Sequence, residues 1–302
     1  MPKRILLIGP TGQVGWELLC CVQSYGQVFA VGRNPTEQPS QAYLDLADPD
    51  SIRSVIQEVK PDIILNAAAY TAVDKAETDT QQAEIIKAIA PGILAEEAKA
   101  LNSLLVHYST DYVFDGTQQH AYQETDTVNP CSVYGKTKLA GEQAIQAVGG
   151  NYLILRTAWV YGMRGNNFLL TIRRLAQERD QLKIVSDQFG TPTWSRMIAE
   201  ATVQILAQLN SPLSQVDTES IAGIYHLTCT GKASWYEFAR AIVAQLDQQP
   251  DVLPISTAEY PTPAKRPAFS LLSNDKLATT FGLTLPHWEY ALELCLAQII
   301  TH

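Results

Sequence analysis

The stretch "RILLIGPTGQVG", residues 4–15, decides the fold. It begins with a short, unbroken apolar run, residues 4–9, of the kind that forms a strand buried on both faces. Glycines then recur at every third position, and a helical pattern opens at residue 13. Spaced glycines are often only a tight turn, but between a buried strand and a helix they allow the backbone to approach a pyrophosphate. We therefore predict a dinucleotide-binding loop made by Gly9, Thr11, Gly12, Gln13, Val14 and Gly15.

Apolar runs of the same character recur along the first half of the chain and alternate with helical patterns. The predicted strands after the first are residues 27–32, 62–68, 103–109 and 152–158, and the predicted helices are residues 13–25, 49–59, 80–101 and 135–148. Strands that alternate with helices imply a parallel sheet covered on both faces, with right-handed connections. The fold class is therefore α/β, a doubly wound parallel sheet of the Rossmann type.

The alternation of strands and helices ends at about residue 158. We interpret "YGMRGNNF" (161–168) and "SDQFGTPTW" (186–194) as loops, 195–209 and 234–246 as helices, and 223–228 as a strand. This mixed pattern suits a smaller lobe on the substrate side. We predict that residues 1–157, with roughly 191–228, form an NAD(P)-binding domain, and that 158–190 and 229–302 form a substrate domain.

Composition excludes several classes of function. The net charge of -9, with 31 acidic against 22 basic residues, argues against a nucleic-acid partner. The five cysteines are scattered without C-x-x-C spacing, and the five histidines lack ligand spacing, so we predict no disulfide framework and no metal site. No run approaches the roughly 20 apolar residues that span a bilayer, so we expect no membrane partner and a cytoplasmic location.

The end of the second strand indicates which dinucleotide is bound. An acidic residue there would bond a ribose hydroxyl and favour NAD, whereas this chain has Arg33, which suits a 2′-phosphate. The alternative for Arg33 is a solvated surface charge. We predict NADPH as cofactor, with NADH as the alternative. Asp45, in "LDLAD" (44–48), follows a further strand and either bonds the adenine edge or caps the next segment.

A second motif, "YGKTKLAGE" (134–142), places Tyr134 and Lys138 four residues apart, on one face of a helix. This spacing alone does not separate a surface pair from the proton-handling centre of an enzyme. The helix follows "STDYVF" (109–114), which ends the preceding strand, and ligands in such sheets bind beyond the carboxyl ends of the strands. Thr110, Tyr134 and the glycine loop should therefore converge.

The side chains of Thr110, Tyr134 and Lys138 suit the reduction of a ketone. Hydride transfer from a nicotinamide places negative charge on the carbonyl oxygen, and a phenol can supply the proton. The pKa of free tyrosine is near 10, and a neighbouring ammonium lowers a phenol pKa. We expect Lys138 to lower the pKa of Tyr134 in this way, and the Thr110 hydroxyl to bond the carbonyl oxygen.

A series of motifs resembles one known family. The motifs are "GPTGQVG" (9–15), "NAAAYTAVDKAE" (66–77), "HYSTDYVFDG" (107–116), "NPCSVYGKTKLAGE" (129–142), "RTAWVYGMRGNNF" (156–168), "DQFGTPT" (187–193) and "YPTPAKRP" (260–267). Together they resemble the dTDP-4-dehydrorhamnose reductases, which are extended short-chain dehydrogenases. The matches follow in order along nearly the whole chain. The resemblance implies NAD(P)H-dependent reduction of the 4-keto group of dTDP-4-dehydro-L-rhamnose to dTDP-L-rhamnose, with a tyrosine as proton donor.

The resemblance also implies roles for single residues. It makes Thr110, Tyr134 and Lys138 the catalytic set, with Asp111 in support. Further cofactor contacts are implied for Asp45, Leu46, Ala67, Ala68, Ala69, Tyr70, Tyr134 and Lys138. Substrate contacts are implied for Thr71, Val73, Trp159, Asn167, Gln188 and Arg266, of which Arg266 would reach the diphosphate. The alternatives are a core aromatic for Trp159 and a solvated charge for Arg266.

Two positions depart from the family pattern. Lys87, in "EIIKAIAP" (84–91), stands where the resembled family has an asparagine that helps to align the catalytic lysine. Phe269 stands where the family tends to have an asparagine after Arg266, and a phenyl ring cannot replace the hydrogen bonds of an amide. These departures concern the proton path and the substrate contacts rather than the class of reaction.

Other functions of the same fold remain open. A sugar-nucleotide epimerase can use the same threonine, tyrosine and lysine while it retains its cofactor. A non-catalytic NADP-binding regulatory subunit is also considered, since the regulatory subunit of methionine adenosyltransferase resembles this family. A 4,6-dehydratase needs an additional acidic residue beside its threonine, whereas Asp111 is followed here by Tyr112. The resemblance is compatible with a homodimer.

Overall fold

The computed structural model describes residues 2–33, 41–68, 72–211 and 221–298. Its centre is a seven-stranded sheet in the order β11-β6-β5-β4-β1-β2-β3, and every neighbouring pair is parallel. The strands are β1 (Lys3–Ile8), β2 (Gly26–Gly32), β3 (Gln41–Tyr43), β4 (Ile63–Asn66), β5 (Leu104–Thr110), β6 (Tyr152–Thr157) and β11 (Gly223–His226). The chain order reverses between β1 and β4, as in doubly wound dinucleotide-binding folds. The predicted fold class is confirmed.

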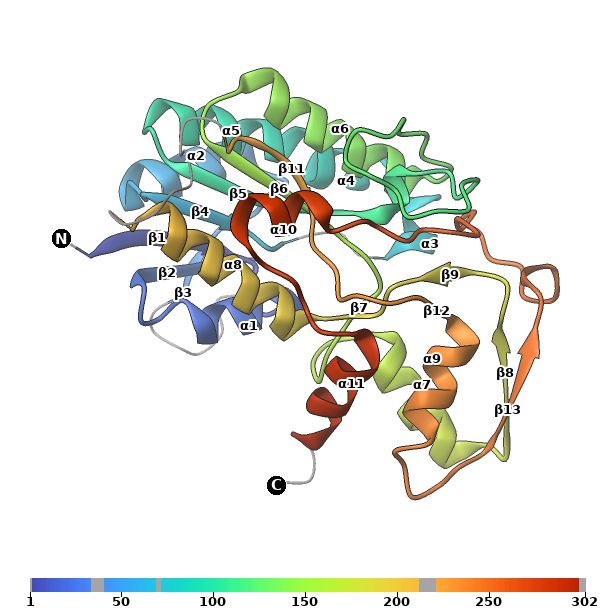
Figure 1. Cartoon of the computed structure of the whole chain (residues 1–302). Coiled ribbons are helices and arrows are strands. Elements are labelled where there is room, and N and C mark those ends of the chain that lie inside the picture. The colour runs from blue at the N-terminus through green and yellow to red at the C-terminus, as the bar shows by residue number, and fades with distance from the viewer. Residues whose placement is uncertain (1, 34–40, 69–71, 212–220, 299–302) are drawn as a thin grey trace.

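Helices cover both faces of this sheet (Figure 1). On one face lie α1 (Gln13–Cys21), α8 (Ser195–Leu209) and α10 (Asp275–Phe281), and on the other α2 (Pro49–Val59), α5 (Ala90–Ala100) and α6 (Val133–Val148). Adjacent residues of β1 point to opposite faces, since Leu7 packs in the cluster with Leu18 of α1 while Leu6 packs with Leu94 of α5. Burial on both faces explains the unbroken apolar run of the first strand.

The predicted helix over residues 80–101 has three parts. A short helix α4 (Thr80–Glu84) leads into a π-helix, η1 (Ile85–Ile89), which continues into α5. The backbone of η1 presses on α6, because a Cβ built on Gly141 would lie only 2.0 Å from the carbonyl oxygen of Lys87. The missing side chain at Gly141 therefore allows the wide turn to approach the helix that carries Tyr134. A further short helix, α3 (Val73–Ala76), was not predicted.

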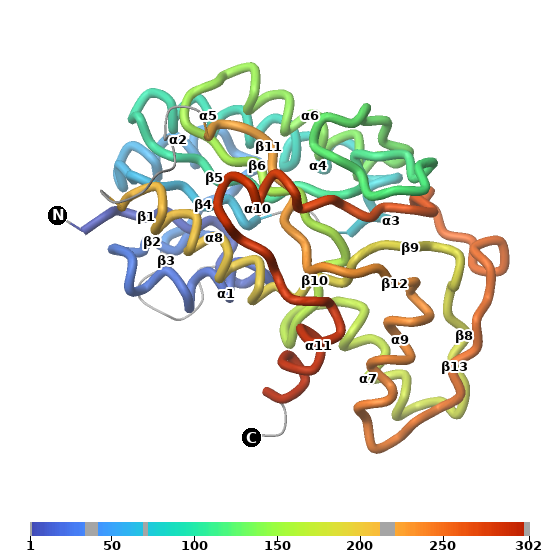
Figure 2. The backbone as a smooth tube through the Cα atoms, viewed as in Figure 1, coloured from blue at the N-terminus to red at the C-terminus, as the bar shows by residue number. Residues whose placement is uncertain are grey.

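The second half of the chain builds a smaller lobe to one side of the sheet (Figure 2). Its main elements are α7 (Phe168–Glu178), β8 (Gln181–Val185), α9 (Trp235–Val243), β13 (Asp251–Ile255) and α11 (Trp288–Ala297). Short elements complete it: β7 (Val160–Tyr161), β9 (Phe189–Gly190), β10 (Thr193–Trp194), β12 (Ala233–Ser234) and the 3-10 turn Thr257–Glu259. Sequence patterns did not predict α7, α11 or the parallel pair of β8 with β13. Short strands also lie within the predicted loop 186–194.

Two elements from the second half join the sheet layer. Strand β11 pairs with β6 at the edge of the sheet, and α8 packs against α1. Both lie in the segment 191–228 that we assigned to the first domain, although the division into two domains stays a prediction. Among the helices of the described residues, none has the length and apolar content needed to cross a membrane. In the same residues no group of three or more histidine, cysteine or acidic side chains is placed to hold a metal ion.

Candidate active site

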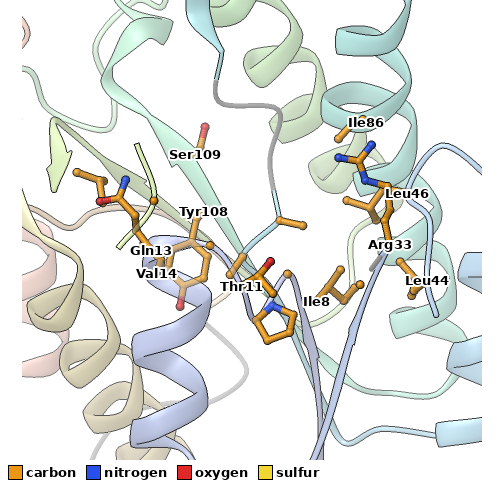
Figure 3. A pocket seen from close by; sticks show the side chains of 18 of the residues that line it. Ile8, Thr11, Gln13, Val14, Arg33, Leu44, Leu46, Ile86, Tyr108 and Ser109 are labelled. Atoms are coloured by element: carbon orange, nitrogen blue, oxygen red, sulfur yellow. The ribbon is translucent and has the colours of Figure 1, made fainter. Parts of the chain in front are cut away.

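One cavity of about 490 Å³ opens at the carboxyl ends of β1, β4 and β5 (Figure 3). It connects the glycine loop with the first turns of α6. The predicted cofactor residues that line it are Gly9, Thr11, Gly12, Gln13, Val14, Arg33, Asp45, Leu46, Ala67, Ala68, Tyr134 and Lys138. Ala69, Tyr70 and Thr71 lie outside the described residues. The two motifs that the sequence analysis singled out therefore share one cavity.

The glycine loop has the geometry of an anion site. Gly9 has a φ of +81°, which is strained for other residues, and a Cβ on Gly15 would lie 1.9 Å from the carbonyl oxygen of Gly9. Gly15 therefore serves the close packing of α1 on the loop and does not line the cavity. Gly12 is the N-cap of α1 and supplies no side-chain cap, and the first turn contains no acidic residue. The uncapped N–H groups beside the cavity fit the pyrophosphate of a dinucleotide.

Arg33 marks the far end of the cavity. It lies near Leu44, Leu46 and Ile86, whereas Gln13, Tyr108 and Ser109 lie at the other end and Thr11 lies between (Figure 3). The Asp45 carboxylate accepts a hydrogen bond of 2.9 Å from the N–H of Ala47 and so caps the following turn, while its contact with an adenine edge stays a prediction. An exposed guanidinium beside an apolar wall suits an adenosine that carries a 2′-phosphate.

The start of α6 positions Tyr134. Ser132 caps the helix, since its hydroxyl accepts a hydrogen bond of 3.1 Å from the N–H of Gly135. A Cβ on Gly135 would lie 2.2 Å from the carbonyl oxygen of Tyr112, so glycine allows α6 to approach the 3-10 turn Asp111–Val113 that follows β5. This approach brings Tyr134 to Thr110, the last residue of β5, and a hydrogen bond joins their hydroxyls.

Burial controls the ionisation of these groups. The pKa of Tyr134 is raised to about 12, mainly because burial disfavours the phenolate and also because of the Asp111 carboxylate, while the hydrogen bond with Thr110 opposes this shift. The expected lowering of this pKa by Lys138 is wrong in direction, since burial dominates. The pKa of Asp111 is raised by burial to about 6, although Ser270 and Thr110 bond the carboxylate. The Thr110 hydroxyl donates to Asp111 Oδ1 over 3.0 Å.

The ammonium of Lys138 is held by two neighbours at the base of the cavity. Lys138 Nζ donates to the carbonyl oxygen of Tyr108 and lies 3.4 Å from Nε2 of His107. Burial lowers the pKa of Lys138 to about 8, and the nearby Glu142 carboxylate opposes this shift. The contacts direct the ammonium to the floor of the cavity, one helical turn from Tyr134.

His107 and Asn66 support this lysine and were not singled out from the sequence. Burial and the Lys138 charge hold the pKa of His107 well below its usual value, so the imidazole is neutral and has one donor and one acceptor. Because Lys138 only donates, Nε2 of His107 accepts and Nδ1 carries the hydrogen. The Asn66 amide is placed with Nδ2 3.0 Å from Nδ1, and its Oδ1 has no hydrogen-bond partner among the described residues. Because Nδ1 carries the hydrogen, exchanging the two ends of the amide satisfies both groups. The amide oxygen therefore faces the ring, and a buried chain runs from Asn66 through His107 to Lys138.

A buried ion pair continues this network along α6. Glu142 lies one turn beyond Lys138 and pairs with Arg156 of β6 over 2.6 Å, and both side chains are almost fully buried. The hydroxyl of Ser109 in β5 donates to the same carboxylate. Tyr134, Lys138 and Glu142 thus occupy one face of α6, where the spacing of four residues places them in a row.

The predicted substrate residues lie around the smaller lobe, and none of those described lines the cavity. Val73 begins α3, and the buried Gln188 donates to the Thr257 hydroxyl over 3.0 Å. Trp159 stacks on Trp235 with ring centroids 3.5 Å apart, and it has a φ of +47°. A left-handed conformation at tryptophan is strained, and such strain often occurs at functional sites. Contact of these residues with a substrate stays a prediction.

Asn167 and Arg266 are engaged by the protein itself. The Asn167 side chain caps α7 and donates to Gln13 Oε1 over 3.0 Å, which ties the smaller lobe to the glycine loop. In the same loop the guanidinium of Arg164 lies 3.5 Å from the ring centroid of Trp16. Arg266 pairs with Asp74 over 3.1 Å. The structure therefore gives Asn167 a positioning role between lobes, and a contact of Arg266 with a diphosphate stays a prediction.

Several residues of the cavity were missed in the sequence, and Phe269 finds a structural role. Tyr108, Ser109 and Thr157 line the cavity from the ends of β5 and β6, so the predicted strand ends already contained their signal. Gly165 and Asn166 line it from the predicted loop 161–168, which no local pattern connects to the first half. Phe269 forms a backbone bridge with Phe189 and packs against a small apolar cluster.

Comparisons with known proteins identify the family of this chain. A family model described as the RmlD substrate binding domain matches residues 3–301. A dTDP-4-dehydrorhamnose reductase of Burkholderia thailandensis is 44% identical, with 99% of each chain covered. A solved dTDP-4-dehydrorhamnose reductase of Clostridium acetobutylicum has a TM-score of 0.88 and 36% identity over 98% of this chain and 99% of that one.

A solved dTDP-4-dehydrorhamnose reductase of Bacillus anthracis, in complex with NADP, is similar to the same degree in fold. Its TM-score is 0.88 and its identity 33%, over 99% of this chain and 100% of that one. The resemblance drawn from the sequence motifs is confirmed. From the glycine loop to the last helix, this chain belongs to the family of the RmlD substrate binding domain.

Proposed function

We propose that this protein reduces the 4-keto group of dTDP-4-dehydro-L-rhamnose to the hydroxyl of dTDP-L-rhamnose, with NADPH as the reductant. The observation that carries the proposal is the continuous cavity from Arg33 and the glycine loop to Tyr134 and Lys138. A dinucleotide that lies along this cavity with its phosphates on the glycine loop ends beside the phenol. The names of the most similar relatives, and the NADP in one of their structures, support the same reaction.

Each group of the site has a task in this reaction. When bound, NADPH supplies a hydride to the carbonyl carbon and becomes NADP⁺. The Tyr134 phenol gives its proton to the carbonyl oxygen, so the C=O double bond becomes a C–OH group and the phenol becomes phenolate. The Thr110 hydroxyl bonds the phenol, and the Lys138 ammonium supplies positive charge at the base of the cavity.

The smaller lobe is proposed to bind the sugar nucleotide. Trp159, Gln188 and Arg266 lie on this side of the molecule, and Arg266 brings a cation that suits a diphosphate. The strained backbone at Trp159 supports a functional role for its ring. The contact of Asn167 with Gln13 links this lobe to the glycine loop and supports neighbouring sites for cofactor and substrate.

The test uses purified protein, NADPH and dTDP-4-dehydro-L-rhamnose. We expect NADPH, followed by its near-ultraviolet absorbance, to be oxidised in equal amount to the dTDP-L-rhamnose formed. Isomerised sugar without net oxidation would instead identify an epimerase. Binding of NADPH without turnover would identify a regulatory protein.

A tyrosine variant tests the proton donor. Tyr134→Phe removes the phenol hydroxyl and should lower kcat by roughly a hundredfold or more while NADPH binding is retained. Tyr225→Phe is the matched control, because Tyr225 is a buried tyrosine whose hydroxyl bonds the carbonyl oxygen of Ile221 outside the cavity. Equal activity in the two variants would refute the role of Tyr134.

A further inference from the structure

A second lysine lies against the ring of Tyr134. Lys87 is only 1% exposed, and its Nζ lies 4.2 Å from the centroid of the Tyr134 ring. Lysine side chains are seldom buried to this degree. A cation over the face of an aromatic ring is attracted by the negative electrostatic potential of that face, and the attraction increases where water is excluded. The contact of Lys87 with Tyr134 is therefore an interaction and not merely proximity.

The π-helix η1 brings Lys87 to this position. The carbonyl oxygen of Lys87 lies against Gly141 of α6, two turns beyond Tyr134, and the absence of a side chain at Gly141 allows this contact. Ile86, which precedes Lys87 in the sequence, lines the cavity. Single π turns within helices are frequent at functional sites. The backbone of η1 is therefore fixed against the helix that carries Tyr134 and Lys138.

Charged side chains of α6 and of the segment after α3 act on Lys87. The pKa of Lys87 is lowered to about 7, mainly by burial and also by repulsion from Lys138 of α6, while the Glu77 carboxylate, which follows α3, opposes this shift. Glu77 also accepts a hydrogen bond of 2.8 Å from the N–H of Val133, at the start of α6. The Asp111 carboxylate also acts on Tyr134, whose pKa it raises. Lys87 thus changes its charge close to neutral pH, within reach of the proposed proton donor.

A cation at this place has a direct consequence for Tyr134. Burial and Asp111 both disfavour the phenolate, and its formation accompanies proton donation. The negative charge of a phenolate is partly delocalised into the ring, so a cation on the ring face stabilises phenolate more than phenol. We propose that Lys87 is a positioning residue for the reduction, whose ammonium stabilises the negative charge that the Tyr134 ring acquires as the phenol donates its proton. This inference rests on the proposed function, because it assigns a role in proton donation.

Kinetics across a range of pH provide the first test. Lys87→Met keeps the length of the side chain without its charge, and Lys136→Met removes an exposed cation from the same helix as Tyr134. At about pH 6 we expect Lys87→Met to lower kcat roughly tenfold with little change in KM, because wild-type Lys87 is then charged. Towards about pH 9 the ratio of wild-type to variant kcat should fall to about one, because wild-type Lys87 is neutral there and its side chain no longer differs in charge from methionine. Lys136→Met should resemble wild type throughout.

A ratio that does not change with pH would show that Lys87 only supports the structure, and the proposal would be wrong. Lys87→Arg provides a second variant, since a guanidinium stays charged over this range. We expect it to retain more activity than Lys87→Met at every pH and to lack the decline of the wild type near neutrality. Equal activity of the arginine and methionine variants at about pH 6 would also overturn the proposal.

A second measurement does not depend on turnover. A polyfluorinated tyrosine, whose phenol ionises at lower pH than tyrosine, is incorporated at position 134 and titrated by fluorine NMR. The phenol ionisation constant should be about tenfold lower in Lys87→Met than in Lys87→Arg, with wild type between and Lys136→Met equal to wild type. The same constant in the methionine and arginine variants would overturn the inference. If the constants differ as expected but no variant and no wild-type protein reduces the sugar, the proposed function fails while the electrostatic role of Lys87 stands.

Discussion

Arg33 is the side chain on which the cofactor preference should depend. It lies at the far end of the cavity, where the adenosine ribose of a dinucleotide on the glycine loop is expected. Arg33→Ala should weaken NADPH binding by roughly 10- to 100-fold through the loss of charge-assisted hydrogen bonds, while NADH binding changes little. Fluorescence titration with both cofactors measures this. Arg174→Ala, which removes an exposed arginine paired with Glu178, is the control, and equal losses for both cofactors would exclude a 2′-phosphate contact.

Asp111 makes the stability of the protein depend on pH. Its folded pKa of about 6 lies above its ordinary value of 3.8, so the native state holds this proton more tightly than the unfolded state. The stability from this group is complete below about pH 4 and is lost as pH rises through about 6. Asp111→Asn removes the ionisation and should stabilise the protein by about 1–3 kcal/mol at pH 7.5 but hardly at pH 4.

Thermal unfolding of wild type and Asp111→Asn at the two pH values measures this difference. Asp126→Asn provides the comparison, since this carboxylate is partly exposed and accepts a hydrogen bond from the N–H of Gln123 near the surface. A gain in Tm that is the same at both pH values would contradict the assigned pKa. Because Asp111 adjoins Thr110, the stabilised variant should also turn over more slowly, as is common where active-site charges are strained.

At the scale of elements, the contact between η1 and α6 depends on one missing methyl group. A side chain at Gly141 would collide with the carbonyl oxygen of Lys87, which belongs to the backbone and has little freedom to move. Gly141→Ala should therefore destabilise the protein by about 1–3 kcal/mol, although alanine is the better helix former. Urea unfolding measures the change. Gly92→Ala meets only the Ala144 methyl at 3.3 Å and should cost less, so a larger loss at Gly92 would contradict this assignment.

The same contact shows why helix prediction succeeds in outline and fails in detail. Residues 80–101 carry a helical pattern, and the chain is helical there, but no local signal announces the π turn at Ile85–Ile89. The turn depends on Gly141, which lies more than fifty residues away in the sequence. By contrast, α2 was predicted with its exact limits, because Asp48 caps it and Pro49 occupies its first turn.

At the scale of the whole molecule, the buried pair of Glu142 and Arg156 joins α6 to strand β6 of the sheet. Glu142→Gln would leave the guanidinium of Arg156 buried without a counter-charge, and we expect a loss of about 3–5 kcal/mol in the free energy of unfolding. Urea unfolding at neutral pH tests this. Glu178→Gln, at an exposed pair with Arg174, should cost less than about 0.5 kcal/mol. A small loss at Glu142 would mean that water reaches the pair.

Sequence patterns alone could predict the sheet and the two motifs that meet in the cavity. Strands buried on both faces are recognisable as unbroken runs of apolar residues. Because ligands bind at the carboxyl ends of parallel strands, Gly12 and Tyr134 could be predicted to lie close together. His107 and Asn66 escaped notice because each reads as an ordinary strand residue, and only pairing of β4 with β5 places them side by side. The smaller lobe was poorly predicted, since its strands β8 and β13 are short and pair across some seventy residues.

The pair of Glu142 and Arg156 also constrains how this family can diverge. One carboxylate serves the hydroxyl of Ser109, the guanidinium of Arg156 and the ammonium of Lys138. Replacement of any one of these residues alone should lower the stability of the protein, unless a second substitution compensates for it. Substitutions at these positions should therefore occur together among members of the family, whereas exposed positions of the same helix can change independently.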